Sequence, residues 1–324
     1  MVDDADDLTG HPVLPELVED LLAEQLGTGR GGARLEGAHE HQSTKVVVSH
    51  VGVVTRRLPD PCDADHAGGS RSYPGPMGWV HAVIDAPADQ HAVQAEFWSR
   101  VLDWPVGAPW PGHPELASFT PPDGTPYVHV QKIDGPPRVH VDIESEDPAG
   151  LATIAVALGA KVRHESDRWQ SLESPGSLPF CVLAATDHEV PSPATWADGH
   201  RSRMVQVCID APRAAHDAEV AFWRDLMPGR WVQSPAQGFA GKWHDDEGSP
   251  LQLLFQRLGE TEGPVRAHLD HGTDNIDTEV ARLRNLGAED IGRWRGWHTL
   301  RDPAGLLFCV TGNSPAQTRL RDLG

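Results

Sequence analysis

Hydrophobic positions after residue 76 follow the periods of strands and helices in turn. Residues 79–84 alternate as in a half-buried strand, and the next segment places Val93, Phe97 and Val101 four residues apart, as on one face of a helix. Two short strand patterns follow, near residues 117–119 and at residues 127–133. This order predicts a β-α-β-β-β unit.

A second unit of the same kind comes next. Residues 138–143 alternate as a strand, and Leu151, Ile154 and Leu158 form the apolar stripe of another helix. Gly159 is expected to end this helix, because glycine readily takes the left-handed backbone conformation that closes a helix. Two more strand patterns complete the unit, at residues 161–165 and 179–184.

The chain then repeats the whole arrangement. Val80–Pro87 returns as Val205–Pro212, and Phe97-Trp98 returns as Phe222-Trp223 at the same offset. Three later segments recur at a nearly equal offset: Arg138–Asp142 as Arg266–Asp270, Leu158–Ala160 as Leu286–Ala288, and Phe180–Val182 as Phe308–Val310. We therefore predict two homologous domains, at residues 77–185 and 203–314, with a linker at 186–202 and a tail at 315–324.

The first 76 residues differ in composition from the rest. All 11 Trp and all 7 Phe lie after residue 76, so this segment lacks the largest core-forming side chains. Its patterns predict one helix at about Pro15–Gln25, one strand at Lys45–Val54 and a linker rich in Pro and Gly. We expect residues 1–76 to be a mobile extension and linker, with a biological start at Met77 as the alternative.

Composition and charge narrow the class of protein. A length of 324 residues suits two domains, and the formal net charge of −20, without a cluster of Lys or Arg, disfavours nucleic-acid and membrane-surface binding. The acidic start Met1–Asp7 differs from a secretory signal, so we expect a cytoplasmic protein, as a monomer or homodimer.

The four cysteines lack a C-x-x-C spacing and are predicted to be reduced thiols: Cys62, Cys181, Cys208 and Cys309.

The repeated motifs resemble those of a known superfamily. The tandem β-α-β-β-β units, the helix with Phe97-Trp98, the strand Val139–Asp142, the Leu-Gly-Ala helix end and the closing segment Asp302–Cys309 are similar to the vicinal oxygen chelate superfamily, more narrowly to its glyoxalase/bleomycin-resistance-like members. The resemblance covers both repeats. It implies an α+β fold in which paired βαβββ modules form curled mixed sheets around a cavity.

The resemblance also implies where a metal would bind. Metal-dependent members carry ligands on the first, the fifth, the last and often the fourth strand of a domain, with a Glu just before the Phe of the closing strand. His81 and His140 match the first and fifth strands of repeat one, but Pro179 stands at the Glu position. The matching residues of repeat two are Gln206, His268 and Leu307. Because both domains lack the anionic ligand, we expect no cofactor, and a metal on His81 and His140 if any.

Strand alternation predicts which side chains line the two cavities. If Val139 and Val141 pack under the helices, His140 and Asp142 face the cavity of repeat one. The same parity adds four residues of neighbouring strands: His81, His129, Gln131 and Cys181. In repeat two it selects Gln206, Cys208, Gln256, His268, Asp270, Leu307 and Cys309.

Tryptophan is unusually frequent, with 11 Trp against 2 Tyr. Trp110, Trp169 and Trp297 fall outside the repeated core elements, and a Trp offers a flat apolar wall with one N–H donor. We therefore expect a small aromatic or hydrophobic molecule in a Trp-lined cavity without a complete metal site. The candidate ligand-binding residues are His129, Gln131, Trp110, Trp169, Cys181, Gln206, His268 and Trp297.

Two other functions stay open beside binding. The first is a lyase- or isomerase-type or metal-assisted enzyme, glyoxalase-like or dioxygenase-like, with His81 and His140 of domain 1 as candidate general bases. The second is a structural or partner-binding protein, since His140-x-Asp142 and its repeat also suit buried structural hydrogen bonds. We expect any pH-dependent function in repeat one, with repeat two as a scaffold or a simpler apolar pocket.

The lack of large aromatic residues before residue 76 generates a first prediction. Limited proteolysis should trim the chain near Pro74-Gly75-Pro76, and the 77–324 fragment should melt cooperatively at nearly the temperature of the full chain. Calorimetry of both forms tests this. A drop of many degrees in the fragment would show instead that the extension completes a domain core.

Overall fold

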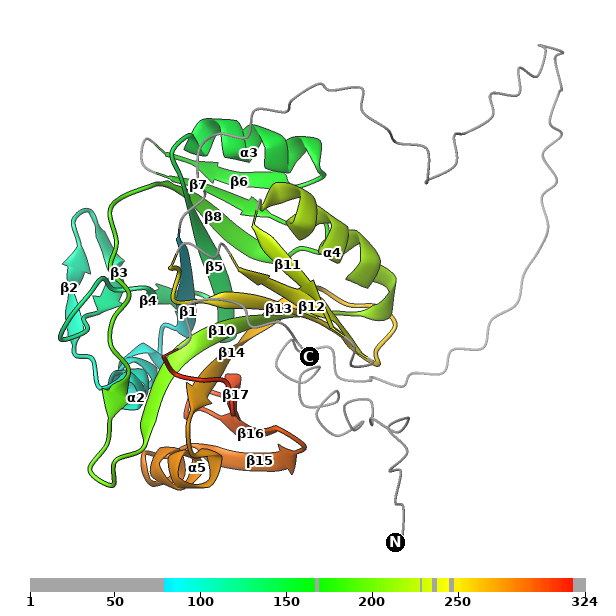
Figure 1. The fold of residues 1–324 in the computed structure, drawn as a ribbon. Helices are drawn as coiled ribbons and strands as arrows, with labels where there is room; N and C mark the ends of the chain where they lie inside the picture. The colour runs from blue at the N-terminus through cyan, green and yellow to red at the C-terminus, as the bar shows by residue number, and fades with distance from the viewer. Residues whose placement is uncertain (1–78, 167–168, 228, 235–237, 245–247, 317–324) are drawn as a thin grey trace, which may run out of the picture. The chain divides into compact units, whose positions relative to one another are not determined.

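The computed structural model describes residues 79–166, 169–227, 229–234, 238–244 and 248–316. The helix and strand predicted before residue 76, the N-terminal extension, Cys62 and most of the tail lie outside these residues. The described helices are α2 (His91–Leu102), α3 (Pro148–Ala157), α4 (Arg213–Leu226) and α5 (Ile276–Asn285) (Figure 1).

Each repeat forms one curled mixed sheet. The strands of the first are β1 (Val80–Pro87), β2 (Val106–Trp110), β3 (His113–Phe119), β4 (Val128–Ile133), β5 (Arg138–Ser145), β6 (Lys161–Glu165), β7 (Trp169–Glu173) and β8 (Pro179–Ala184). Those of the second are β9 (Ala194–Thr195), β10 (Arg201–Ala211), β11 (Arg230–Gln233), β12 (Phe239–His244), β13 (Gln252–Arg257), β14 (Arg266–Thr273), β15 (Glu289–Trp294), β16 (Trp297–Arg301) and β17 (Leu307–Thr311).

The two sheets have the same topology. The first has the order β2-β3-β4-β1-β5-β8-β7-β6, and the second has the order β11-β12-β13-β10-β14-β17-β16-β15, with β9 added beside β10. Two βαβββ modules meet in each sheet at a central antiparallel pair, β1 with β5 and β10 with β14. The predicted α+β fold of paired βαβββ modules is confirmed.

Two strands of the first sheet were not predicted from the sequence patterns. β2 contains Gly107 and Pro109, residues that weaken a strand pattern, and β7 is only five residues long. Trp110 ends β2, Trp169 begins β7 and Trp297 begins β16, so all three belong to the repeated sheets. The expectation that these tryptophans lie outside the core elements is wrong.

The predicted apolar stripe of α2 is only partly right. Phe97 and Val101 are buried, but Val93 is 46% exposed. The buried face instead includes Gln94 and Trp98, both of which form hydrogen bonds described below. A polar residue with a buried partner thus occupies a core position that a hydrophobicity pattern cannot recognise. α3 ends as predicted, with Gly159 at a φ of +107°.

The two repeats share one hydrophobic core. Trp98 of α2 contacts Phe308 of β17, with ring centroids 5.0 Å apart, and Trp223 of α4 contacts Phe180 of β8 at 5.2 Å. The first helix of each repeat therefore packs against the closing strand of the other repeat. α3 and α4 lie side by side (Figure 1).

Buried hydrogen bonds accompany both contacts. Gln94 Nε2 and Trp98 Nε1 donate to Asp302 Oδ2 over 2.7 and 2.9 Å. In the equivalent contact, Glu219 accepts from the backbone N–H of Gly176 over 2.9 Å and from Trp223 Nε1 over 2.7 Å. A carboxylate therefore lies buried in each helix–strand contact.

Three further side-chain hydrogen bonds link the repeats. The Tyr127 hydroxyl donates to the carbonyl of Met204 over 2.7 Å. The Arg282 guanidinium of α5 donates to the carbonyls of Arg100 and Val101 over 3.1 and 2.9 Å. These carbonyls lie in the last turn of α2, where a cation is favourable because of the helix dipole.

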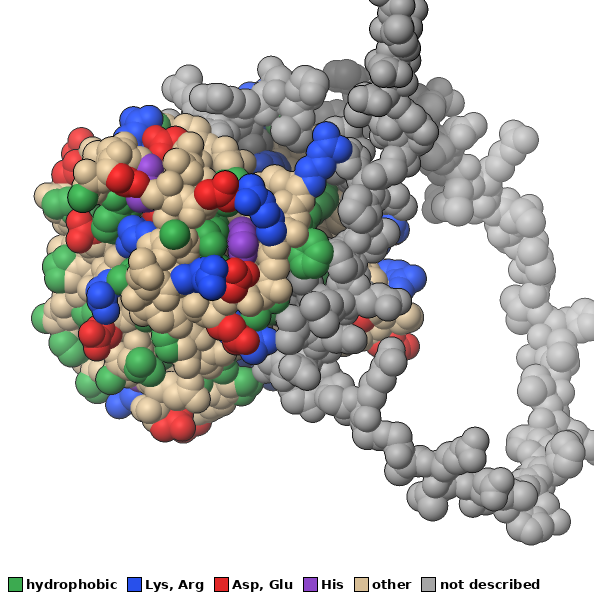
Figure 2. All heavy atoms as spheres, turned by 90° about the horizontal axis from the view of Figure 1, so that it is seen from below, with side chains coloured by type: hydrophobic (Ala, Val, Ile, Leu, Met, Phe, Trp, Pro, Cys, Tyr) green, Lys and Arg blue, Asp and Glu red, His purple; other side chains and the backbone are tan. Residues whose placement is uncertain are grey.

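Side chains of both charge signs are interspersed with apolar ones on the face seen in Figure 2. None of the helices among the described residues is long and apolar enough to cross a membrane.

The Asp302 contact generates a second prediction. Asp302→Ala leaves the buried donors of Gln94 and Trp98 without an acceptor, along with the N–H groups of Ala304 and Leu306 that bond to Asp302 Oδ1. We expect the free energy of unfolding to fall by about 3 kcal/mol in urea titrations. The exposed Glu146→Ala serves as control and should change it by less than about 0.5 kcal/mol. An effect of Asp302→Ala below about 1 kcal/mol contradicts the prediction.

Candidate functional site

The second sheet surrounds a cavity of about 180 Å³. Phe239, Leu254, Trp297 and Leu307 provide apolar walls, whereas the polar lining includes Gln206, Cys208, Lys242, Gln256, His268, Asp270 and Cys309. The volume is comparable to the ~150 Å³ of an apolar cavity that takes up benzene in an engineered protein. All seven residues that strand alternation selected for repeat two line this cavity; their roles in binding stay predictions.

His268 lies between two carboxylates in this cavity. Its Nδ1 is 2.6 Å from Asp210 Oδ2 and its Nε2 is 3.4 Å from Asp270 Oδ1. Asp270 also accepts a hydrogen bond from Gln206 Nε2. Burial opposes protonation of His268, but the Asp210 carboxylate holds the pKa of His268 well above its usual value. His268 is therefore a cation at neutral pH.

The same arrangement recurs in repeat one. His140 Nδ1 is 3.0 Å from Asp85 Oδ1, and His140 Nε2 is 3.3 Å from Asp142 Oδ1. Arg138 Nε donates to Asp85 over 2.6 Å. Burial again opposes protonation, but Asp85 and Asp142 raise the pKa of His140 well above its usual value. His140 already carries a proton at neutral pH, which does not suit the role of general base that the sequence suggests.

A chain of hydrogen bonds links four side chains of repeat one to a carboxylate. Trp110 Nε1 donates to Ser118 Oγ over 3.0 Å, Ser118 Oγ is 2.9 Å from His129 Nδ1, and His129 Nε2 is 3.0 Å from His81 Nδ1. His81 Nε2 then reaches Glu144 Oε1 at 3.0 Å. Burial lowers the pKa of His129 to about 3. With neutral imidazoles, every group can donate to the next one toward Glu144.

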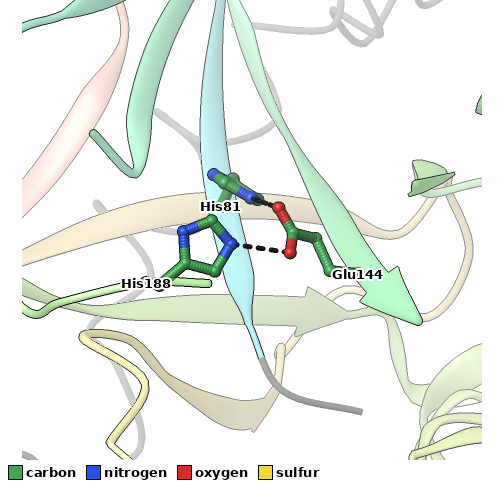
Figure 3. A group of neighbouring side chains, drawn as sticks. All are labelled: His81, Glu144 and His188. Atoms are coloured by element: carbon green, nitrogen blue, oxygen red, sulfur yellow. Dashed lines mark hydrogen bonds and ion pairs between the residues drawn. The ribbon is translucent and has the colours of Figure 1, made fainter. Parts of the chain in front are cut away.

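Glu144 also binds His188, which follows β8. Glu144 Oε2 is 2.6 Å from His188 Nε2 (Figure 3). The same oxygen accepts the backbone N–H of Thr186 over 3.0 Å. Trp79 stacks on the His188 ring with centroids 4.3 Å apart. Burial opposes ionisation of Glu144, but hydrogen bonds from His81 and His188 lower its pKa. Glu144 is therefore an ionised carboxylate between two imidazoles.

A family model described as a glyoxalase-like domain matches residues 81–183 and 206–311, more than half of the chain. The chain belongs to the glyoxalase-like domain family. No curated protein matches this glyoxalase-like protein. The structure of the Mn(II)-bound glyoxalase from Novosphingobium aromaticivorans is similar, with 14% identity and a TM-score of 0.53 over 74% of this chain and 82% of that one.

A triple mutant of 4-hydroxymandelate synthase from Streptomyces coelicolor is also similar in structure. Its identity is 11% and its TM-score 0.50, over 76% of the glyoxalase-like chain and 95% of the synthase. At such identities the likeness shows the fold alone, which is that of the vicinal oxygen chelate superfamily.

Several groups of side chains in the glyoxalase-like protein could hold a metal ion. Among the described residues, four groups place their ligand atoms within 4.8 Å of one another: His81, Glu144 and His188; His140, Asp142 and Cys181; Cys208, Asp210 and His268; and His268, Asp270 and Cys309. Metal ligands must be deprotonated. The last three groups each combine a protonated imidazole with a thiol whose pKa is raised by burial. The first group fits a metal best.

The remaining predicted residues of the glyoxalase-like protein lie apart from these groups. Trp169 contacts the edge of His113, with centroids 4.6 Å apart, and Gln131 pairs with Leu116 in the first sheet. Cys181, Cys208 and Cys309 are free thiols, as predicted.

Sequence reasoning missed several residues of these sites, including Ser118 and Phe239. Asp85 and Asp210 stand in the repeated segments Val80–Pro87 and Val205–Pro212, and their recurrence was a usable signal. Glu144 shares the strand parity of His140 and Asp142, which was also a signal. His188 and Lys242 fall in segments without any motif.

The Asp210–His268 contact generates a third prediction. Asp210→Asn removes the nearest charge, so the pKa of His268 should fall markedly, as measured by NMR titration of the imidazole. In the wild type the protonated His268 stabilises the fold below pH ~6.5, and this contribution is lost as the pH rises through the higher folded pKa. Asp85→Asn is the matched control and should shift His140 but not His268. An unchanged His268 titration in Asp210→Asn contradicts the prediction.

Proposed function

We propose that this glyoxalase-like protein binds a small aromatic or hydrophobic molecule in the cavity of its second repeat. The observation that carries the proposal is the pair of aromatic walls. Phe239 and Trp297 lie edge to face, with centroids 6.4 Å apart at 85°, and both line the cavity with Leu254 and Leu307. The two perpendicular rings form an apolar corner, in which a flat ligand ring contacts one aromatic side chain with its face and the other with its edge.

Lys242 favours a ligand that carries an acidic group. It lines the same cavity, and burial lowers its pKa while the Asp270 carboxylate opposes this shift. Asp270 is itself engaged by Gln206 and His268, and the side chain of Lys242 makes no hydrogen bond or ion pair within the described part of the chain. An ammonium in a partly desolvated cavity attracts a carboxylate more strongly than it would in water. A small aromatic carboxylate is the class that satisfies both the walls and the cation.

The polar groups around the cavity favour binding without transformation. His268 carries its proton between two carboxylates, and burial raises the pKa values of the Cys208 and Cys309 thiols. The cavity therefore offers neither a free imidazole base nor a thiolate nucleophile at neutral pH. Ligand recognition is the function that these groups serve best.

A second candidate function is proton-transfer catalysis in repeat one. It is favoured by the chain from Trp110 through Ser118 and His129 to His81 and Glu144. A neutral His129 can accept a proton at one ring nitrogen and release one at the other, as a relay requires. His81 would then be the base, with Glu144 as its partner.

Calorimetric titration of the full chain with benzoate, toluene and benzylamine tests the proposed binding. Benzoate is expected to bind tightest of the three, because it matches both the aromatic walls and Lys242. Trp297→Ala should weaken benzoate by about tenfold, which corresponds to the loss of ~1.4 kcal/mol of packing. Lys242→Met should weaken benzoate by a similar factor and leave toluene unchanged.

Trp169→Ala is the matched control, since Trp169 occupies the position in repeat one that corresponds to Trp297. It should leave benzoate binding intact. Binding that is lost in Trp169→Ala but retained in Trp297→Ala would move the ligand to repeat one and overturn the proposal. Equal affinity for benzoate and benzylamine would show that Lys242 does not select an acidic ligand.

A further inference from the structure

One cluster of titratable side chains in repeat one is missing from the corresponding positions of repeat two. The Asp-His-Asp arrangement recurs in both repeats, as expected for groups that hold the strands together. The cluster of His81, Glu144 and His188 does not recur. The corresponding residues of repeat two are Gln206, Gly272 and Ala316, none of which is an imidazole or a carboxylate. The same fold therefore forms without this cluster, and strand packing does not account for it.

We propose that His81, Glu144 and His188 bind one divalent transition-metal ion. His81 comes from β1, Glu144 from the end of β5 and His188 from the segment after β8, and the three side chains converge (Figure 3). Each imidazole presents its Nε2 to a different oxygen of the Glu144 carboxylate, at 3.0 and 2.6 Å. The ligand atoms thus already surround one point.

The ligand types select the class of metal. Two imidazoles and one carboxylate suit Zn²⁺ and Fe²⁺, whereas Mg²⁺ and Ca²⁺ prefer oxygen ligands alone. With metal–ligand bonds of about 2.1 Å, neighbouring ligand atoms of a tetrahedral site lie about 3.4 Å apart. The present contacts would open by less than about 1 Å to reach that separation. Three protein ligands leave further positions on the metal for water or a substrate.

Outer hydrogen bonds orient His81 and Glu144, and a ring stack orients His188. His81 Nδ1 contacts His129 Nε2 at 3.0 Å, and His129 Nδ1 contacts Ser118 Oγ at 2.9 Å. The Thr186 N–H holds one oxygen of Glu144. Trp79 fixes the plane of the His188 ring by stacking. Metal-binding histidines commonly have such a partner on the second ring nitrogen, because it sets the tautomer that leaves the first nitrogen free.

The proposed site differs from the one that the family resemblance implies. The resemblance requires a Glu on the closing strand, where this chain has Pro179, and on that ground the sequence disfavours a metal. Glu144 supplies a carboxylate from the end of β5 instead, and His188 replaces a ligand from within the sheet. His140 is not needed, since it is held between Asp85 and Asp142.

Metal binding can be measured without any knowledge of a reaction. The full chain is stripped with a chelator and titrated calorimetrically with Zn²⁺, and then with Co²⁺ while the visible spectrum is recorded. We expect one equivalent of metal per chain, a higher melting temperature with Zn²⁺, and a Co²⁺ spectrum without thiolate charge transfer. His188→Ala and Glu144→Gln should each weaken Zn²⁺ binding by at least ~100-fold.

Two control variants address the competing groups. Cys181→Ser changes the other group of repeat one, and His268→Gln changes both groups of repeat two. Both should keep one equivalent of metal. The proposal is overturned if Zn²⁺ binds to His188→Ala as tightly as to the wild type, if it is lost in Cys181→Ser, or if the stripped wild-type chain takes up none. The melting temperature of each metal-free variant shows whether the fold is intact, and His188→Gln replaces His188→Ala if that variant fails to fold.

Discussion

The structure depends on the contact between the first helix of each repeat and the closing strand of the other repeat. Each first helix packs on its own sheet and also places a Trp against the Phe of the other repeat's closing strand, so one face of each sheet belongs to the shared core. Successive residues of a strand point to opposite faces. Because Phe180 and Val182 face the shared core, Cys181 must face the other way, and the same holds for His140 between Val139 and Val141. The core contact therefore decides which polar side chains meet.

The polar side chains on the opposite faces fall into two kinds. The Asp-His-Asp groups recur in both repeats and hold a protonated imidazole between carboxylates. Such a group has no ring nitrogen to spare, and its ion pair between the first and fifth strands holds these strands together. The cluster around Glu144 is not repeated at the corresponding positions of repeat two, where a different carboxylate, Glu279, lies between His200 and His271. The apolar corner of Phe239 and Trp297 is the main feature of the cavity in repeat two. The two repeats therefore share the Asp-His-Asp groups and differ in the other side chains on these faces.

Much of the fold followed from periodicity and internal repetition. The strands around His81, His140 and Cys181 were predictable because their alternation is regular, and the repeat offset identified the second copy of each. β2 was not predictable, since Gly107 and Pro109 obscure its pattern. Val93 was misplaced, because Gln94 takes a buried position through a hydrogen bond that no hydrophobicity scale records.

The sites were less accessible from sequence than the fold. Strand parity correctly gathered the residues around the second cavity, because a strand fixes the direction of each side chain. The location of His188 depends on the path of a segment between two strands, and the role of Lys242 depends on its burial. Neither is encoded in a local pattern. The protonation of His140 likewise depends on Asp85, which is distant in sequence and adjacent only in the folded sheet.

The buried carboxylates between the repeats have a consequence for how the two halves recognise each other. Gln94 and Glu219 occupy equivalent helix positions, and Ser174 and Asp302 occupy equivalent turns, where each accepts the N–H of the residue four positions later. The acid thus lies on the turn in one contact and on the helix in the other. Two copies of the second half would bury Glu219 against Asp302, acid against acid, and two copies of the first half would leave the Trp98 indole without its acceptor. Only unlike halves satisfy both contacts, so the duplicated chain selects its own other half over a copy of itself.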